Sequence, residues 1–201
     1  MSRLNLTIGI SEYDHVRDIQ TGRVPVEGCD VNVINFEIEE VFHRFTLERE
    51  WEVSEMSMAK YLAQIAGDRP DITAIPVFPS RMFRLSNIYI NADAGIKTPE
   101  DLRGKRIGTP EWAQTASVYT RGWLVDHVGI PLSEIDWRQA GASQPGRIEK
   151  VKLKLPEGVT VTPEPTRSLS EMLVKGDLDA AFSAHAPQSF LDGHPKVRQL
   201  F

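Results

Sequence analysis

Two of the five histidines occupy positions from which a side chain could exchange protons with a bound molecule. His15 follows the first predicted strand, and His185 lies at the end of the last one. Imidazole suits acid–base work because its unperturbed pKa is near neutral, and ligands of parallel sheets bind beyond the carboxyl ends of the strands. We therefore predict catalytic roles for both. The other histidines fit a helix interior, a helix end and a polar turn, where structural or solvated roles are usual: His43, His127 and His194.

Two carboxylates follow predicted strands in the same way. Glu55 lies after a short strand near residue 54, and Glu12 lies after the first strand. A carboxylate can accept hydrogen bonds from a bound molecule and exchange protons with it, and we assign a catalytic role to Glu55. Either side chain could equally be a solvated loop acid, which is the better interpretation of Glu12. Asp177 and Asp179 are expected to serve a helix stop and a strand start.

Hydroxyl side chains lie where predicted strands lead into helices. The free N–H groups and the positive end of the helix dipole make such positions suitable for an anion. For Thr115, ordinary helix capping is the alternative, and the two roles are compatible. We predict ligand-binding roles for four residues: Ser11, Ser57, Thr115 and Ser117.

Strands and helices alternate along the chain and would position these residues. Apolar alternation and β-branched residues predict strands at 4–10, 29–36, 51–56, 72–78, 87–91, 105–109, 135–139 and 180–184. Helical spacing predicts helices at 14–21, 39–49, 58–66, 115–128 and 168–175, with a further helix start at 98–101. The stretch 141–165, rich in Gly, Pro and charge, receives no element. The alternation indicates parallel βαβ units and an α/β fold.

The chain is expected to form two lobes. We place the first part of lobe one at 1–95, lobe two at 96–190, and the start of a return segment at 191–201. A two-lobed binding fold sends its chain back into the first lobe. We therefore expect either a fragment or a first lobe that is incomplete at its C-terminal end.

Composition narrows the classes of partner. The 201 residues are 41% hydrophobic and 25% charged, with a net charge of −5, so we expect neither nucleic acid nor an anionic membrane as a partner. The single cysteine, Cys29, cannot form an internal disulfide and is expected to be a small buried thiol. We detect no secretory signal or membrane-spanning run, which favours a soluble cytoplasmic protein. Nucleotide-binding glycine motifs and the G-x-S-x-G motif are missing from the sequence.

Two segments resemble the type 2 periplasmic-binding-protein-like superfamily. Residues 95–109 read GIKTPEDLRGKRIGT, and residues 174–187 read VKGDLDAAFSAHAP. Two others are similar to the 4,5-dihydroxyphthalate decarboxylase family: residues 76–90 read PVFPSRMFRLSNIYI, and residues 108–124 read GTPEWAQTASVYTRGWL. The resemblance covers essentially the whole chain, although members of that family are longer. It implies a two-lobed fold in which each lobe is a mainly parallel sheet flanked by helices.

The family resemblance also implies a reaction, the decarboxylation of an aromatic ortho-dicarboxylate that bears two ring hydroxyls. Such a dianion needs cationic partners, and guanidinium groups bind carboxylates in a bidentate manner. Arg81 and Arg84 lie in the first family-like segment and are therefore predicted to bind substrate; the alternative is exposed arginines in a turn. An ionised hydroxyl para to one carboxylate would make the ring carbon basic. A general acid would then protonate that carbon, and CO₂ would leave.

Alternatives stay open at the level of function. A non-catalytic solute-binding or ligand-sensing protein shares this architecture, and so would an enzyme acting on another small aromatic or thiamine-precursor-like molecule. No organic cofactor is implied. Catechols chelate metals, so a divalent ion is not excluded, although no His-x-His or His-Glu motif supports one. The predicted partner is a small aromatic dicarboxylate, and the sequence does not decide whether the protein forms a homo-oligomer.

Overall fold

Strand β1 (Leu4–Ile10) forms where predicted and is the central strand of a three-stranded parallel sheet, with β2 (Cys29–Asn35) and β3 (Val53–Ser54) on its two sides. The computed structural model describes residues 2–67 and 71–201. Its contacts divide the chain between Arg81 and Met82 into a first unit and a second unit.

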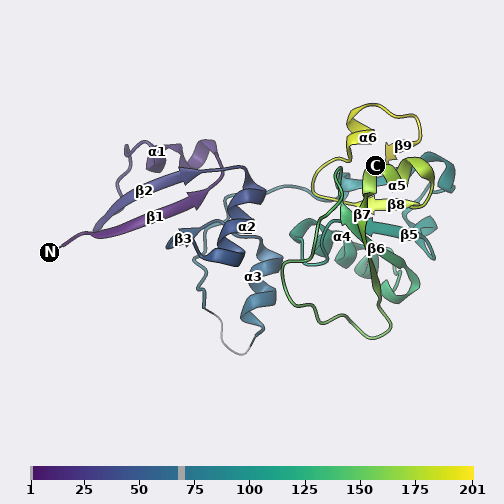
Figure 1. Cartoon of the computed structure of the whole chain (residues 1–201), viewed down its shortest axis with the longest axis horizontal. Helices are drawn as coiled ribbons and strands as arrows, with labels where there is room; N and C mark the ends of the chain where they lie inside the picture. Colours follow the sequence, from purple (N-terminus) through teal and green to yellow (C-terminus); the bar gives the residue numbers. More distant parts are fainter. Residues whose placement is uncertain (1, 68–70) are drawn as a thin grey trace. The chain divides into compact units, whose positions relative to one another are not determined.

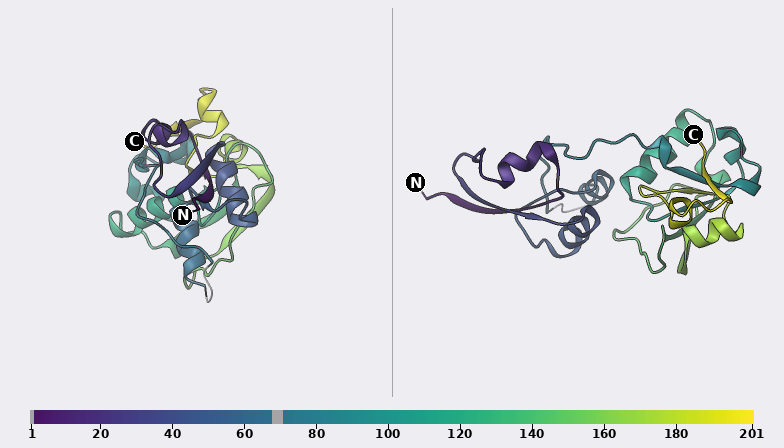
Figure 2. Two further views of the ribbon diagram at one scale, coloured as in Figure 1. Left: turned by 90° about the vertical axis from the view of Figure 1, so that its left-hand side faces the viewer. Right: turned by 90° about the horizontal axis from the view of Figure 1, so that it is seen from above.

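Helices connect the three strands of the first unit. In Figures 1 and 2, α1 lies on the side of β1 and β2 away from α2 and α3. The helical elements are η1 (Asp14–Val16), α1 (Arg17–Gln20), α2 (Ile38–Glu48) and α3 (Met58–Ile65). The amphipathic face of α2 packs against the sheet, and its buried side chains Val41 and Phe45 form a small core with Trp51. Gly9 allows this packing, because a Cβ there would overlap the indole of Trp51.

The second unit is built on a six-stranded sheet of order β7-β6-β5-β8-β4-β9. The pairs β7–β6, β6–β5 and β5–β8 are parallel, whereas β4 runs antiparallel to both of its neighbours, β8 and β9. The strands are β4 (Ile88–Asn91), β5 (Arg106–Thr109), β6 (Asp136–Gly141), β7 (Val161–Ser168), β8 (Ala180–Phe182) and β9 (Val197–Gln199). The helical elements are η2 (Leu85–Asn87), η3 (Ala92–Ala94), η4 (Pro99–Leu102), α4 (Thr115–Asp126), η5 (Leu132–Glu134), α5 (Leu169–Lys175) and α6 (Gln188–Leu191).

Both faces of the six-stranded sheet are covered. Along β4, Ile88 and Ile90 join a core cluster with Leu124 of α4, whereas Tyr89 between them joins a cluster with Leu173 of α5. This is the alternation expected of a strand that is buried on both sides. Near the end of β5, Gly108 allows close packing on one face, since a Cβ there would overlap Leu169 and contact Leu178.

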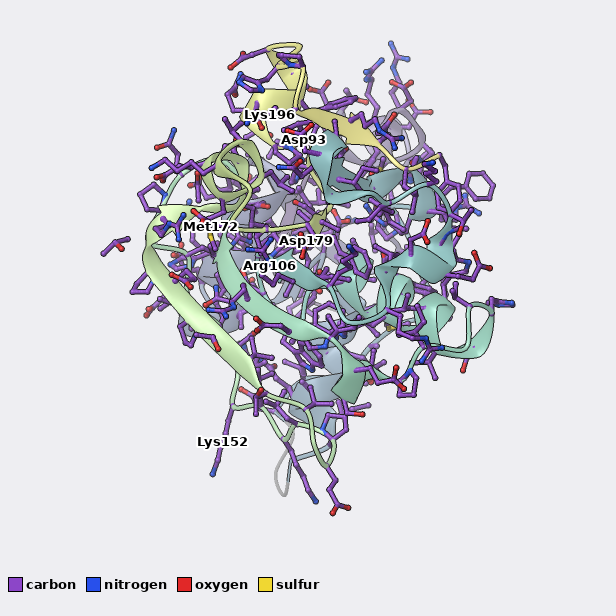
Figure 3. All side chains as sticks on the ribbon, turned by 90° about the vertical axis from the view of Figure 1, so that its right-hand side faces the viewer. Asp93, Arg106, Lys152, Met172, Asp179 and Lys196 are labelled. Carbon is purple, nitrogen blue, oxygen red and sulfur yellow. The ribbon has the colours of Figure 1, made fainter. Side chains whose placement is uncertain are left out.

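Charged contacts join neighbouring strands of this sheet. Asp179, directly before β8, accepts the Arg106 backbone N–H at 2.9 Å, and its two oxygens accept Nε at 3.0 Å and Nη2 at 2.8 Å (Figure 3). These bonds lower the pKa of the Asp179 carboxyl, against the opposing effect of its burial. The predicted role of Asp179 at a strand start is confirmed.

Three predictions need correction. No strand forms at 72–78, where Pro76 and the following Pro79 lack N–H groups and Ile75 and Phe78 stay exposed. Strand β7 lies in the stretch that received no element; its two prolines are tolerated because β7 is an edge strand. Cys29 is only partly buried, at the start of edge strand β2.

The division of the chain also differs from the expected boundary. We placed that boundary at residue 95, after β4, whereas β4 pairs with β8 and β9 inside the second unit. Across residues 2–67 and 71–201, no helix is both long and apolar enough to span a membrane.

Candidate functional site

Glu55 is the centre of a polar cluster at the carboxyl ends of β1 and β3 in the first unit. Its Oε1 accepts a hydrogen bond of 2.8 Å from the Tyr13 hydroxyl, and the Ser11 backbone N–H acts to lower the pKa of the carboxyl. The His15 ring lies beside that of Tyr13, with 5.3 Å between ring centroids. Three residues predicted from sequence, Ser11, His15 and Glu55, are therefore brought together, because parallel strands end at the same edge of a sheet.

Burial sets the chemistry of Glu55. The residue is 8% exposed, and its Oε2 is buried without a hydrogen-bond partner. This burial raises the pKa of the carboxyl, while the bonds from Tyr13 and Ser11 and the charge of His15 act in the opposite direction. A carboxyl with a raised pKa is a stronger base when ionised, which suits proton transfer near neutral pH.

Ser57 lies two residues beyond Glu55 and is the N-cap residue of α3, as the sequence predicts. It is buried, and its carbonyl accepts the Tyr61 N–H at 2.9 Å. Ser57 thus lies shortly after the carboxyl end of β3, at the start of the helix predicted there. Its contact with substrate stays a prediction.

The second unit has a comparable loop between β5 and α4. Thr115 is the first residue of α4, and Gln114 takes the N-cap position instead. Ser117 is fully buried, with its hydroxyl oxygen 2.6 Å from that of Thr109 and 3.3 Å from Gln114 Oε1, to which it donates. The Ser117 hydroxyl therefore stabilises the loop, and the part proposed for it in substrate binding stays untested.

A buried ion-pair cluster holds the same loop. Glu111 is 1% exposed, and its Oε1 lies 2.6 Å from Arg147 Nε and 3.3 Å from Lys150 Nζ. Nearby, the Glu149 carboxylate accepts the Ala113 backbone N–H at 3.1 Å. Charges from 147–150 thus fix the loop that follows β5. Sequence reasoning missed this cluster because the partners of Glu111, Arg147 and Lys150, belong to the stretch 141–165, which received no element.

Arg121, on α4, is another buried charged residue. It is 5% exposed, its Nη2 donates to the Trp112 carbonyl at 2.7 Å, and its guanidinium carbon lies 3.7 Å from the centroid of a Trp112 ring. Its Nη1 is buried without a hydrogen-bond partner. Burial lowers the pKa of Arg121 to about 9, so the group stays protonated at neutral pH. Arg121 was not singled out from the sequence, although it lies in the family-like segment 108–124.

The remaining predicted site residues lie outside these clusters. His185 is exposed in the bend after β8, as its position in the sequence indicates. Arg81 is exposed at the end of the first unit, and Arg84 is partly buried at the start of the second. Within the first unit, the structure thus groups Ser11, His15 and Glu55 with each other, whereas His185 and Arg84 belong to the second unit.

The described part of the chain has a further hollow, in the second unit. This hollow of about 300 Å³ lies between α5 and α6, lined in part by Ser170, Lys175 and His194. It does not include any of the predicted site residues. Within 2–67 and 71–201, no three His, Cys, Asp or Glu side chains are grouped to hold a metal ion.

Two curated proteins are similar to the entire chain. A 4,5-dihydroxyphthalate decarboxylase from Comamonas testosteroni is 41% identical over 202 residues, which cover 100% of this chain and 61% of that protein. A protein of the same name from Pseudomonas putida is 40% identical over 202 residues, covering 100% of this chain and 78% of the relative. The chain therefore spans less than two thirds of the Comamonas relative. No protein-family model matches it.

Solved structures agree with the α/β fold. The periplasmic aliphatic sulphonate binding protein SsuA from Escherichia coli matches with a TM-score of 0.55 and 13% identity, over 99% of this chain and 60% of that one. The alkanesulfonate-binding protein SsuA from Xanthomonas axonopodis pv. citri, bound to MOPS, matches with a TM-score of 0.52 and 15% identity, over 100% of this chain and 61% of that one. The predicted binding-protein-like fold is confirmed.

Proposed function

The chain belongs to the 4,5-dihydroxyphthalate decarboxylase family, and from this premise we propose that the whole protein converts 4,5-dihydroxyphthalate to protocatechuate and CO₂ in phthalate degradation. The observation that carries the proposal is the identity of about 40% to two such decarboxylases over the full length of this chain. We further propose that the reaction takes place in the cytoplasm, the compartment predicted from the sequence.

The fold supports a small anionic guest. The two SsuA proteins with this fold are named for binding sulphonates, and the dicarboxylate proposed here is also a small anion. In our proposal Arg81 and Arg84 bind the two carboxylates, and Ser11, Ser57, Thr115 and Ser117 support binding from loops at strand ends.

Decarboxylation needs a base at a ring hydroxyl and an acid at a ring carbon. Ionisation of the hydroxyl para to the departing carboxylate makes the carbon that bears this carboxylate basic. Protonation of that carbon then allows the C–C bond to break, and its electron pair restores the aromatic ring as CO₂ leaves. We assign the acid to His185, the hydroxyl acceptor to Glu55, and a supporting acid–base role to His15.

An assay with the full-length protein tests the activity. Incubation with 4,5-dihydroxyphthalate should release CO₂ and form protocatechuate in equal amounts. Tight binding without product would favour a solute-binding or ligand-sensing protein, the alternative that the SsuA-like fold supports. Neither binding nor turnover would reject both functions. A parallel assay with a metal chelator tests whether a divalent ion takes part.

Two substitutions test the assigned roles. His185→Ala should abolish turnover and largely preserve substrate affinity, because the acid acts after binding. Arg81→Ala should weaken substrate binding by about 2–5 kcal/mol, the cost of leaving a buried carboxylate without its cation. Calorimetric titration together with product formation measures both effects. A wild-type rate and affinity in either variant would remove that residue from the mechanism.

A further inference from the structure

Among the described residues, Tyr13 hydrogen-bonds the Glu55 carboxylate through its side chain and reaches one of the two oxygens. Its hydroxyl donates to Oε1 at 2.8 Å, whereas Oε2 is buried and has no hydrogen-bond partner. The two oxygens of one carboxylate are therefore in different states. Sequence analysis did not single out Tyr13.

The unsatisfied oxygen is costly for the folded protein. A buried carboxylate is normally paired with a cation or fully hydrogen-bonded, because burial without a partner loses the free energy of hydration. Here the groups that act on the carboxylate are Tyr13, the Ser11 N–H and the His15 ring, all from the segment that follows β1.

Other ionisable groups on the surrounding elements are engaged elsewhere or buried. Glu12 lies 3.5 Å from Arg17, and Glu52 accepts the Thr7 backbone N–H at 2.8 Å. Lys60 of α3 is buried and has interactions of its own. A ligand group can complete a buried acceptor of this kind, and ligands of parallel sheets bind beyond the carboxyl ends of the strands.

We propose that Tyr13 is a positioning residue for Glu55: its hydroxyl holds one carboxylate oxygen and leaves the other as the single acceptor for a ring hydroxyl of the substrate. The inference rests on the proposed function, to which it adds a residue and an atom. It needs only contacts inside the first unit.

The proton transfer is balanced in three steps. The hydroxyl O–H bond breaks, its proton goes to Oε2 of Glu55, and its electron pair stays on oxygen and moves into the ring. The ring carbon then takes a proton from a separate acid, the C–C bond breaks, and CO₂ leaves. Finally, Glu55 returns its proton to the ring oxygen, so that one proton is consumed for each CO₂ released.

The pH dependence of kcat/KM in the full-length protein tests the role of Tyr13. Glu55 must be ionised to act, so activity should rise with pH through its pKa. Tyr13→Phe removes a bond that stabilises the ionised form, so this ascending limb should move to higher pH and the loss should be largest at low pH. Glu55→Gln should lower kcat/KM by about 10²–10⁴-fold and remove the limb.

Tyr61→Phe is the matched control, since it also removes one hydroxyl from the first unit and should leave the profile unchanged. A Tyr13→Phe profile like that of wild type would overturn the inference. So would an equal loss at every pH with no movement of the limb, because that result indicates a merely structural role.

Carbon-13 NMR of the labelled carboxyl groups separates this inference from the proposed function. The Glu55 resonance, assigned by its disappearance in Glu55→Gln, should titrate at a higher pH in Tyr13→Phe than in wild type. Absence of turnover in wild type would reject the proposed function whatever the NMR result. Normal turnover with an unshifted Glu55 resonance in Tyr13→Phe would reject the inference alone.

Discussion

Each unit has a buried glutamate close after the end of a strand, Glu55 after β3 and Glu111 after β5. The groups that surround the two carboxylates differ. In the first unit, the Glu55 carboxylate accepts a hydrogen bond from the Tyr13 phenol. In the second, Glu111 is approached by both Arg147 and Lys150. Burial alone therefore does not distinguish a reactive acid from a structural one. The partners do, because a nearby cation stabilises the ionised form and a phenol does so more weakly.

The hydrophobic cores of the two units also differ, in size. Among the residues described, the core cluster of the first unit is small and has Val41, Phe45 and Trp51 as its buried members. The second unit has two larger clusters, one on each face of its sheet. Since burial of apolar surface is the main favourable term in folding, we expect the second unit to be the more stable and the first to open at lower cost.

The largest expected effect comes from Trp137→Ala in the second unit. The indole is fully buried, its N–H donates to the Leu132 carbonyl at 2.8 Å, and its ring centroids lie 5.3 Å from Trp112 and 5.8 Å from Phe182. Its removal should lower the free energy of unfolding of this unit by about 3–5 kcal/mol. Hydrogen exchange measured on separate peptides would report the protection of each unit by itself. An equal loss of protection in both units would contradict the expectation that the second unit alone is destabilised.

Glu111→Gln is expected to have the next largest effect. The amide keeps the shape of the side chain but leaves Arg147 and Lys150 without their buried anion, at a cost of about 2–3 kcal/mol. Urea denaturation followed through the second unit would measure it. A variant as stable as wild type would show that the cluster does not stabilise the loop. Glu111 could then no longer be regarded as a structural acid in contrast to Glu55.

A smaller effect of opposite sign is expected for Glu55→Gln. Burial raises the pKa of Glu55 in the folded state, so its contribution to stability is fully present below the pKa of the unfolded chain, about 4.3, and is lost as pH rises through the folded value. The variant should therefore be more stable than wild type at neutral pH, with the difference vanishing in acid. Denaturation from pH 3 to pH 8 tests this, and a variant less stable than wild type at pH 7 would contradict it.

The order of the regular elements could largely be predicted from the sequence because alternation and helix ends are local signals. β1, α3 and α5 differ from their predicted ranges by no more than one residue at either end. The segment 72–78 misled us because a short apolar run has the composition of a strand, yet a strand also needs a neighbour with which to pair. The opposite error at β7 arose because two prolines are unfavourable inside a sheet but acceptable at its edge.

The candidate site was predictable only in part. Position after a strand was enough to select Ser11, His15 and Glu55, because parallel topology brings strand ends together. It was not enough to find Tyr13, whose importance depends on which way its hydroxyl points. Nor could it find Arg121 or the Glu111 cluster, since the burial of a charge and the approach of a distant loop are properties of tertiary packing.

Strand β9 pairs with β4, the first strand after the junction between the units. Because β4 lies near the beginning of this unit and β9 near residue 199, their pairing joins two strands that are distant in sequence. Contacts of this kind slow folding, since a long loop must close before the pairing can contribute. We therefore expect the edge of this sheet to form late in the folding of the second unit.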